Sequence, residues 1–244
     1  MNQAQETIEN CKNCNSELLG DFCSTCGHPH KLKRINGQYI ISEVGSILNF
    51  DKGILFTIKE MLLRPGQSIQ KFILEDRNRL VKPIVYIIVC SLIYTLIQQL
   101  LRFEDGYVNY SDQQGSTTLL IFQWVSNNYG YANILMALFI ALWIQIFFRK
   151  FGYNFFEILI LLCFVMGTGM LLFSIAGIVD SLVSLKIIDK GFLLGILYMA
   201  WAIGQFFGKK IWNYIKAFLA YMLGLITFTF AVLLIGNLID LLWN

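Results

Sequence analysis

Five long apolar stretches follow one another between residues 83 and 238, and they limit the folds that are open to this chain. A helix needs about 20 mostly apolar residues to cross a bilayer, because the hydrocarbon core is about 30 Å thick and each helical residue rises about 1.5 Å. We predict membrane-spanning helices at residues 83–101, 131–148, 156–178, 191–207 and 217–238. The expected fold is therefore an all-α integral membrane protein.

Charged residues are concentrated ahead of these stretches. Residues 1–82 contain 20 of the 35 Asp, Glu, Lys and Arg residues, although 56% of the whole chain is hydrophobic. We expect three parts: a cysteine-containing segment (residues 1–32), an amphipathic arm (33–82) and a helix bundle (83–244). The net charge of +3 is small, and the basic residues form no cluster interleaved with aromatic side chains. This pattern excludes a nucleic-acid partner.

The distribution of Lys and Arg predicts the orientation of the bundle, because loops rich in these residues stay on the cytosolic side. Residues 1–10 have neither the basic nor the apolar region of a signal peptide, so we expect a cytosolic N-terminus. With five spans, the C-terminus is then expected outside. One side receives most of the basic residues: Arg77, Arg79, Lys82, Arg149, Lys150, Lys209, Lys210 and Lys216.

A shorter apolar segment, residues 119–125, precedes the second predicted span and is interrupted by Asn127 and Asn128. We interpret it as a re-entrant or interfacial segment on the outer side. In the alternative interpretation it is fused with the second span, which leaves the number of spans unchanged.

Four cysteines near the N-terminus follow the spacing C-x2-C-x8-C-x2-C: Cys11, Cys14, Cys23 and Cys26. Two such pairs can supply the four thiolates of a tetrahedral metal site. A cytosolic location disfavours two disulfides, and the paired spacing disfavours four idle thiols. Zinc is expected, with iron as the less favoured ion. His28 and His30 follow directly and are interpreted as surface residues rather than ligands.

Apolar residues recur at helical spacing from Tyr39 to Leu63, with charged residues among them. This pattern predicts amphipathic helices on the inner leaflet or beneath the bundle. The sequence Arg64-Pro65-Gly66 should break the helix, and Ser68 can cap a new one. Three basic residues that follow are candidates for contact with lipid headgroups, although their simplest role is to set the topology: Arg77, Arg79 and Lys82.

The predicted spans contain little that could carry out chemistry. Glu157, at the inner mouth of the third span, is the best candidate for a buried functional acid, whereas Asp180 and Asp240 are expected at interfaces. No span contains histidine, and no Ser–Lys, Ser–His or paired-Asp arrangement is evident, so we do not expect an enzyme. Glycines predict close helix packing, within the chain or across a dimer: Gly167, Gly169, Gly191, Gly195, Gly204 and Gly208.

The order of these features resembles the bacterial membrane family catalogued as domain of unknown function 3667, which occurs mainly in Bacteroidetes. Members have an N-terminal cysteine ribbon, an Arg-Ile segment, an Asp-Lys-Gly-like turn, an Arg-Pro-Gly turn and an Arg-rich stretch that ends in proline. This chain has the ribbon from Cys11 to Gly27, followed by Arg34-Ile35, Asp51-Lys52-Gly53, Arg64-Pro65-Gly66 and Lys82-Pro83. It departs from the pattern at Glu75, where a glycine is common, and at Ile158, where a histidine often follows the glutamate. The resemblance implies a bacterial inner-membrane location and no particular activity.

Two functional hypotheses follow. In the first, a non-enzymatic multi-pass protein uses its zinc ribbon and arm to recruit or regulate a cytosolic or membrane protein partner, and homo-oligomers are compatible with it. In the second, the chain is a small solute or lipid transporter, or a membrane-trafficking protein similar in span count to the Yip family. Polar residues in or near the spans motivate the second hypothesis: Gln145, Glu157, Gln205 and Asn237. A water-lined cavity would favour transport, and a solid bundle would count against it.

Overall fold

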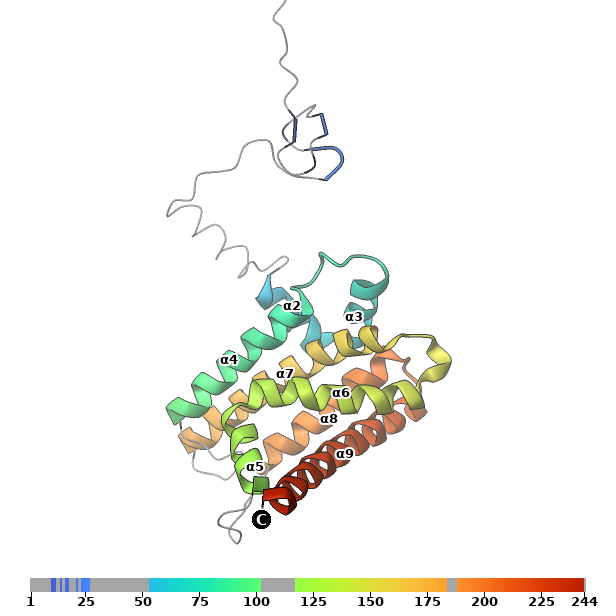
Figure 1. Ribbon diagram of the computed structural model, residues 1–244. Helices are drawn as coiled ribbons and strands as arrows, with labels where there is room; N and C mark the ends of the chain where they lie inside the picture. Colours follow the sequence, from blue (N-terminus) through green and yellow to red (C-terminus); the bar gives the residue numbers. More distant parts are fainter. Residues whose placement is uncertain are drawn as a thin grey trace, which may run out of the picture. The chain divides into compact units, whose positions relative to one another are not determined.

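The computed structural model describes residues 10, 11, 14, 16, 17, 21, 23–26, 53–101, 117–183 and 188–243. The chain divides into two compact units, Met1–Ser46 and Ile47–Asn244. Within the described part of the first unit, an isolated antiparallel bridge joins Asn10 to Glu17. The described part of the second unit consists of helices and their connections (Figure 1). The amphipathic helix predicted before residue 53 lies outside the described residues, as do His28 and His30.

The second unit begins with two short helices, α2 (Ile54–Leu63) and α3 (Pro65–Leu74). Arg64 alone separates them, and Pro65 occupies the first turn of α3, where the missing N–H costs nothing. The predicted break at this turn is therefore confirmed. The predicted cap at Ser68 is wrong, because Pro65 already starts the helix and Ser68 is buried within it.

A helix lies over each of the five predicted spans. Three helices are long and apolar enough to cross a membrane: α4 (Pro83–Leu101), α7 (Phe155–Val183) and α9 (Ile211–Trp243). Two further helices, α6 (Tyr129–Phe147) and α8 (Ile188–Phe206), contain the shorter apolar stretches Tyr131–Phe147 and Leu193–Phe206. These helices indicate a membrane protein. The remaining elements of the second unit are α5 (Thr117–Asn127) and the 3-10 helix η1 (Arg149–Phe151).

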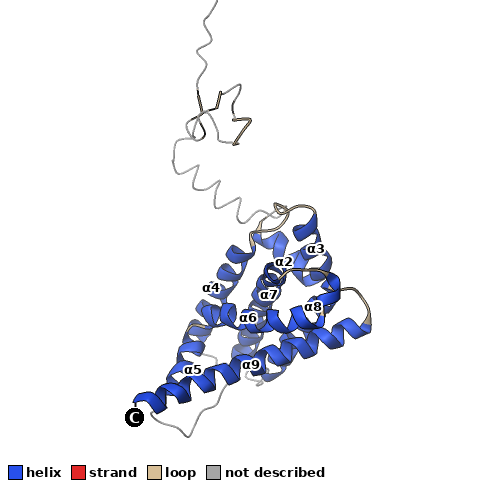
Figure 2. Ribbon diagram, turned by 45° about the vertical axis from the view of Figure 1, so that its right-hand side comes forward, coloured by secondary structure: helices blue, strands red, loops and turns tan. Residues whose placement is uncertain are grey.

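Helix α7 is the centre of the bundle formed by α4 to α9. It packs against α4, α6 and α8, while α9 packs against α6 and α8 (Figure 2). About two thirds (67%) of the most apolar segment of α7 is buried inside the protein, whereas only 22% of the corresponding segment is buried in α4 and 22% in α9. The outer helices therefore present apolar side chains away from the bundle, as helices in contact with lipid tails do.

Small residues on α7 allow its neighbours to approach closely. Gly167 faces the ring of Tyr86 on α4, and Gly169 faces Met199 on α8. Between them, Thr168 lies 2.9 Å from the Tyr86 hydroxyl. The predicted close packing is thus confirmed within the chain for these glycines and for others that face side chains of neighbouring helices: Gly191, Gly195 and Gly204. Packing across a dimer stays a prediction.

Helix α5 is a separate element rather than an extension of α6. Asn128, with a φ of −124°, ends it, and α5 turns away from the axis of α6 (Figure 1). The alternative of a fused helix is therefore wrong. The Asp240 carboxylate on α9 accepts hydrogen bonds from the backbone N–H of Thr117, at 3.1 and 3.2 Å, and from its hydroxyl. Asp240 thus caps α5 from a distant part of the chain.

Candidate functional site

The four predicted metal ligands lie together in the first unit. The sulfur atoms of Cys11, Cys14, Cys23 and Cys26 all lie within 4.8 Å of one another. The Cys11–Cys26 and Cys14–Cys23 sulfur pairs are 3.6 and 3.5 Å apart. A tetrahedral site with metal–sulfur bonds of about 2.3 Å places its sulfurs about 3.8 Å apart. The cluster, which contains no disulfide, could therefore hold one metal ion.

Ser16, which lies between Cys14 and Cys23 in the sequence, contacts two sulfurs of this cluster. Its hydroxyl lies 2.9 Å from the sulfur of Cys14 and 3.2 Å from that of Cys23. The hydrogen bond from Ser16 lowers the pKa of the Cys14 thiol. Hydrogen bonds from Ser16 and from the backbone of Cys26 and Thr25 lower the pKa of Cys23 to about 5. Because metals bind the thiolate, these hydrogen bonds favour the binding form.

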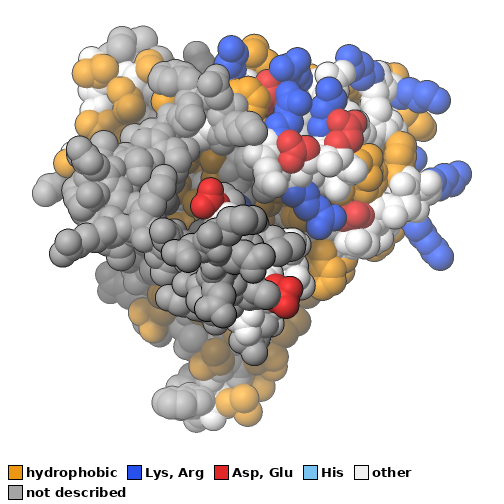
Figure 3. Space-filling model, turned by 90° about the horizontal axis from the view of Figure 1, so that it is seen from above, with side chains coloured by type: hydrophobic (Ala, Val, Ile, Leu, Met, Phe, Trp, Pro, Cys, Tyr) orange, Lys and Arg blue, Asp and Glu red, His pale blue; other side chains and the backbone are white. Residues whose placement is uncertain are grey.

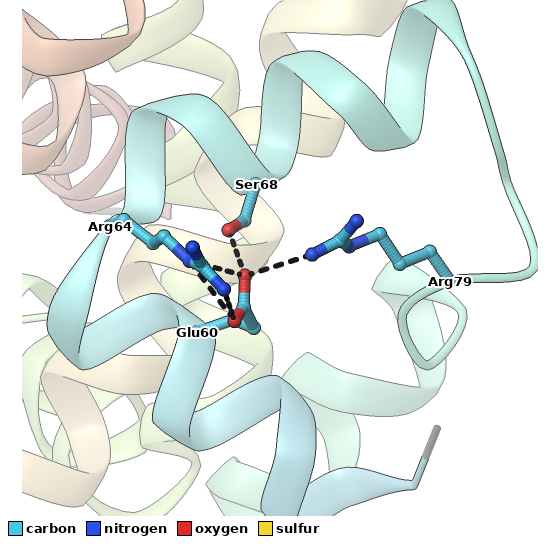
Figure 4. A network of polar contacts seen from close by, with 4 residues as sticks. All are labelled: Glu60, Arg64, Ser68 and Arg79. Carbon is cyan, nitrogen blue, oxygen red and sulfur yellow. Dashed lines mark hydrogen bonds and ion pairs between the residues drawn. The ribbon is translucent and has the colours of Figure 1, made fainter. Parts of the chain in front are cut away.

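A second polar site, which we call the Glu60 network, lies between α2 and α3. Glu60 is the only buried charged side chain in the part of the chain that the structure describes, with 2% of its surface exposed. Arg64 donates to both of its carboxylate oxygens, from Nε at 3.1 and 3.0 Å and from a terminal nitrogen at 2.7 Å. The Ser68 hydroxyl donates at 2.5 Å, and a terminal nitrogen of Arg79 lies 3.5 Å away (Figure 4).

The network keeps Glu60 ionised. Burial opposes its charge, but hydrogen bonds from Arg64 and Ser68 and the charges of Arg64 and Arg79 outweigh burial and hold the pKa of Glu60 below its ordinary value. Glu60 lies on α2, and its three partners come from the α2–α3 connection, from α3 and from the α3–α4 connection. One carboxylate therefore joins three consecutive segments of the chain.

The α2–α3 pair is also fixed to one end of α8. The Gly66 N–H donates to Gln205 Oε1 at 2.8 Å, and Gln70 Nε2 donates to the Phe206 carbonyl at 2.6 Å. A Cβ atom at Gly66 would lie 2.5 Å from the backbone of Gln205. The glycine of the Arg-Pro-Gly turn is thus needed for this close approach.

The three predicted headgroup residues are not equivalent. Arg77 and Lys82 are exposed, and within the described residues neither forms an ion pair. Arg79 instead points to Glu60 and lies 5.9 Å from the ring centre of Phe56. The structure therefore places Arg79 in the Glu60 network and leaves Arg77 and Lys82 facing outward.

Glu157 lies at the start of α7 and is half-buried. Its backbone N–H donates to Asn154 Oδ1 at 2.9 Å, and its Oε2 accepts from the Asn154 N–H at 2.8 Å. This reciprocal pair is a capping box. Glu157 is therefore a helix-capping acid at the end of the bundle, rather than an acid deep within it.

From the sequence, Glu60 was only one of the charged residues within the amphipathic pattern from Tyr39 to Leu63, and its partners were not identified. The spacing of four residues between Glu60 and Arg64 was an available signal, because such residues face each other on a helix. The contribution of Arg79 had no comparable signal, because it depends on how the α3–α4 connection folds back. The contacts of Ser16 with Cys14 and Cys23 likewise depend on how the loop folds, so the sequence did not reveal them.

The Glu60 network coincides with the part of the chain that matches a known family. No curated protein and no solved structure matches the chain. The family model described as "Protein of unknown function (DUF3667)" matches residues 51–95, the segment that contains α2, α3 and most of α4.

Proposed function

We propose that this chain is a non-enzymatic, multi-pass inner-membrane protein whose zinc ribbon recruits or regulates a protein partner at the cytosolic face. The observation that carries the proposal is the close cluster of four cysteine sulfurs. With all four positions of a tetrahedron supplied by the protein, a bound ion keeps none open for substrate. Such a site stabilises a small fold that can present a surface to another protein.

The proposed topology has five spans, with α6 and α8 crossing beside the three longer helices. It is supported by the basic residues, which gather at the end of the second unit seen in Figure 3. That end includes the α3–α4, α6–α7 and α8–α9 connections. We assign it to the cytosolic side.

The Glu60 network makes the α2–α3 pair suitable as the segment that connects the cysteine ribbon to the helix bundle. The pair is fixed within itself by Glu60 and to α8 by Gly66 and Gln70. A segment held in this way can join a cytosolic ribbon to the bundle without adding another span.

Metal analysis of the detergent-purified protein tests the ribbon. We expect about one zinc per chain, measured by elemental mass spectrometry, as for other four-thiolate sites. The double variant Cys11→Ser/Cys14→Ser should lose it, whereas Cys163→Ser, which changes a cysteine on α7, should retain it. One iron per chain would instead indicate a redox site.

Recruitment needs its own test. Proteins that co-purify with the wild type after mild cross-linking should be depleted with Cys23→Ser/Cys26→Ser and retained with Cys163→Ser. If the zinc-free variant brings down the same proteins in the same amounts, the ribbon does not recruit them.

The transport hypothesis is less well supported by the polar residues that motivated it. Gln145 Nε2 donates to the Tyr153 carbonyl at 3.1 Å, and Gln205 accepts from Gly66 at 2.8 Å. Asn237 is exposed on α9. These side chains therefore serve local contacts or face outward instead of lining a shared path.

A further inference from the structure

A pocket of about 370 Å³ lies where the α3–α4 connection meets the start of α7. Its charged and polar lining comes from Arg77, Asn78, Lys82, Asn154 and Glu157. Its apolar lining is Phe72, Ile73, Pro83, Phe156 and Ile160. We call it the headgroup pocket, and it is distinct from both the four-cysteine cluster and the Glu60 network.

The cations of this pocket are available to a ligand. Arg77 and Lys82 are exposed and make no ion pair within the described residues, although Glu157 lines the same pocket. Their neighbour Arg79 is used by Glu60. Two cations that line one pocket without being paired to its single acid favour an anionic group, and arginine suits phosphate because its planar fork can donate two parallel hydrogen bonds.

The Glu157 carboxylate can accept a hydrogen bond from a ligand in the same pocket. Glu157 uses Oε2 to cap the Asn154 N–H at 2.8 Å, which leaves Oε1 as an acceptor. The lining thus offers two positive groups from the α3–α4 connection and one negative group from the start of α7. A ligand that matches them carries a phosphate and, close to it, a cationic hydrogen-bond donor.

The apolar side of the pocket opens to the outside of the bundle. Phe156 is 74% exposed at the first turn of α7, and Ile84, just beyond Pro83, is 67% exposed. Exposed apolar side chains next to exposed cations are typical of the boundary between headgroups and acyl chains. The ligand therefore has a charged head and an apolar body.

We propose that the headgroup pocket binds a phospholipid with a primary amine, phosphatidylethanolamine, through its phosphate at Arg77 and Lys82 and its ammonium at Glu157. The ammonium has three N–H donors for the carboxylate. Phosphatidylglycerol offers the phosphate without the cation, and phosphatidylcholine carries a cation without N–H donors. The pocket should therefore discriminate among the three lipids.

Native mass spectrometry of the full-length, delipidated protein tests this proposal with each lipid added separately. Wild type should bind phosphatidylethanolamine at least about tenfold more tightly than the other two lipids, the order of effect expected for charge-assisted hydrogen bonds. Arg77→Gln/Lys82→Gln should lose about tenfold in affinity for phosphatidylethanolamine. Glu157→Gln should lose the preference over phosphatidylcholine, and it retains the helix cap because glutamine can serve at this capping-box position.

Arg149→Gln/Lys150→Gln is the matched control, because it removes two exposed basic residues from the same end of the bundle but outside the pocket. It should bind phosphatidylethanolamine as the wild type does. Thermal unfolding of all variants distinguishes lost binding from lost folding. Equal binding of all three lipids, or equal losses in the control and in Arg77→Gln/Lys82→Gln, would overturn the proposal.

Discussion

The burial of Glu60 reverses, for part of α2, the orientation in which a helix turns its charged residues to water. Periodicity predicts that charged residues of α2 face water, yet Glu60 and Thr57 are buried while Leu62 and Leu63 are exposed. Burying a carboxylate is costly unless cations and hydrogen bonds compensate for the lost water. Arg64, Ser68 and Arg79 supply them here.

We expect Glu60→Gln to destabilise the protein by about 1–3 kcal/mol, since the arginines lose a charged partner but remain partly hydrated. The midpoint of thermal unfolding in detergent measures the loss. Glu75→Gln is the control, because Glu75 is exposed just after α3 and its replacement removes the same charge.

The difference in stability between wild type and Glu60→Gln should depend on pH. Folding lowers the pKa of Glu60 below its ordinary value of 4.5. The ionised carboxylate therefore stabilises the folded state at pH values above 4.5, and this contribution disappears as the pH falls through the lower, folded pKa. The difference in midpoint between wild type and Glu60→Gln should be constant near neutral pH and shrink in acid. A difference that grows in acid, or no difference at neutral pH, would contradict this role.

At the level of elements, the sequence was most informative where covalent chemistry determines the backbone. Pro83 and Pro65 start α4 and α3, and both starts could be predicted. Long apolar stretches located the other predicted spans, although α9 extends beyond the predicted 217–238 at both ends. The break between α5 and α6 was visible in the sequence at Asn127 and Asn128, whereas the cap from Asp240 could not be predicted, because it depends on a contact between α5 and α9, which are far apart in the sequence. The cysteine cluster was predictable because its ligands are close in sequence.

The contact between α3 and α8 depends on Gly66. Gly66→Ala places a methyl group against the Gln205 backbone, so we expect α3 to separate from α8. Amide hydrogen exchange followed by mass spectrometry should show faster exchange in α2 and α3, with the middle of α7 unchanged. Gln67→Ala changes the adjacent exposed position and should exchange like the wild type. Unchanged protection of α3 in Gly66→Ala would show that the contact is dispensable.

Considered as a whole, the bundle has a central helix, outer helices with apolar surfaces and one strongly basic end. Aromatic rings pack against one another at this basic end. Phe148 stacks on Phe207 with ring centres 3.9 Å apart, and the ring centres of Tyr153 and Phe206 are 4.6 Å apart. These contacts join the α6–α7 connection to the end of α8 and to the α8–α9 connection. The segments proposed to face the cytosol are thus held together by packing as well as by their charge.

The proposed topology, five spans with a cytosolic N-terminus, places the two ends of the chain on opposite sides of the membrane. Alkaline phosphatase, which is active only outside the cytosol, should be active when fused after residue 243 and inactive when fused after Lys150 or Lys210. A fusion after Leu182 should be active and serves as an internal control for the loop between α7 and α8. An inactive fusion at residue 243 combined with an active one at residue 182 would require an even number of spans.

Helix α9 has a consequence for the bilayer around the protein. Its segment Ile211–Leu242, which has Lys216 near one end and Asp240 near the other, is about 48 Å long, whereas the adjoining apolar stretch of α6, Tyr131–Phe147, is about 26 Å long. A hydrocarbon core of about 30 Å cannot match both helices when they stand upright. With α6 crossing as proposed, α9 leans or extends its ends at Lys216 and Asp240 beyond the core, and lipids beside α6 thin to meet its shorter apolar surface. The protein would then favour regions of reduced membrane thickness and would deform the leaflets unequally around its perimeter.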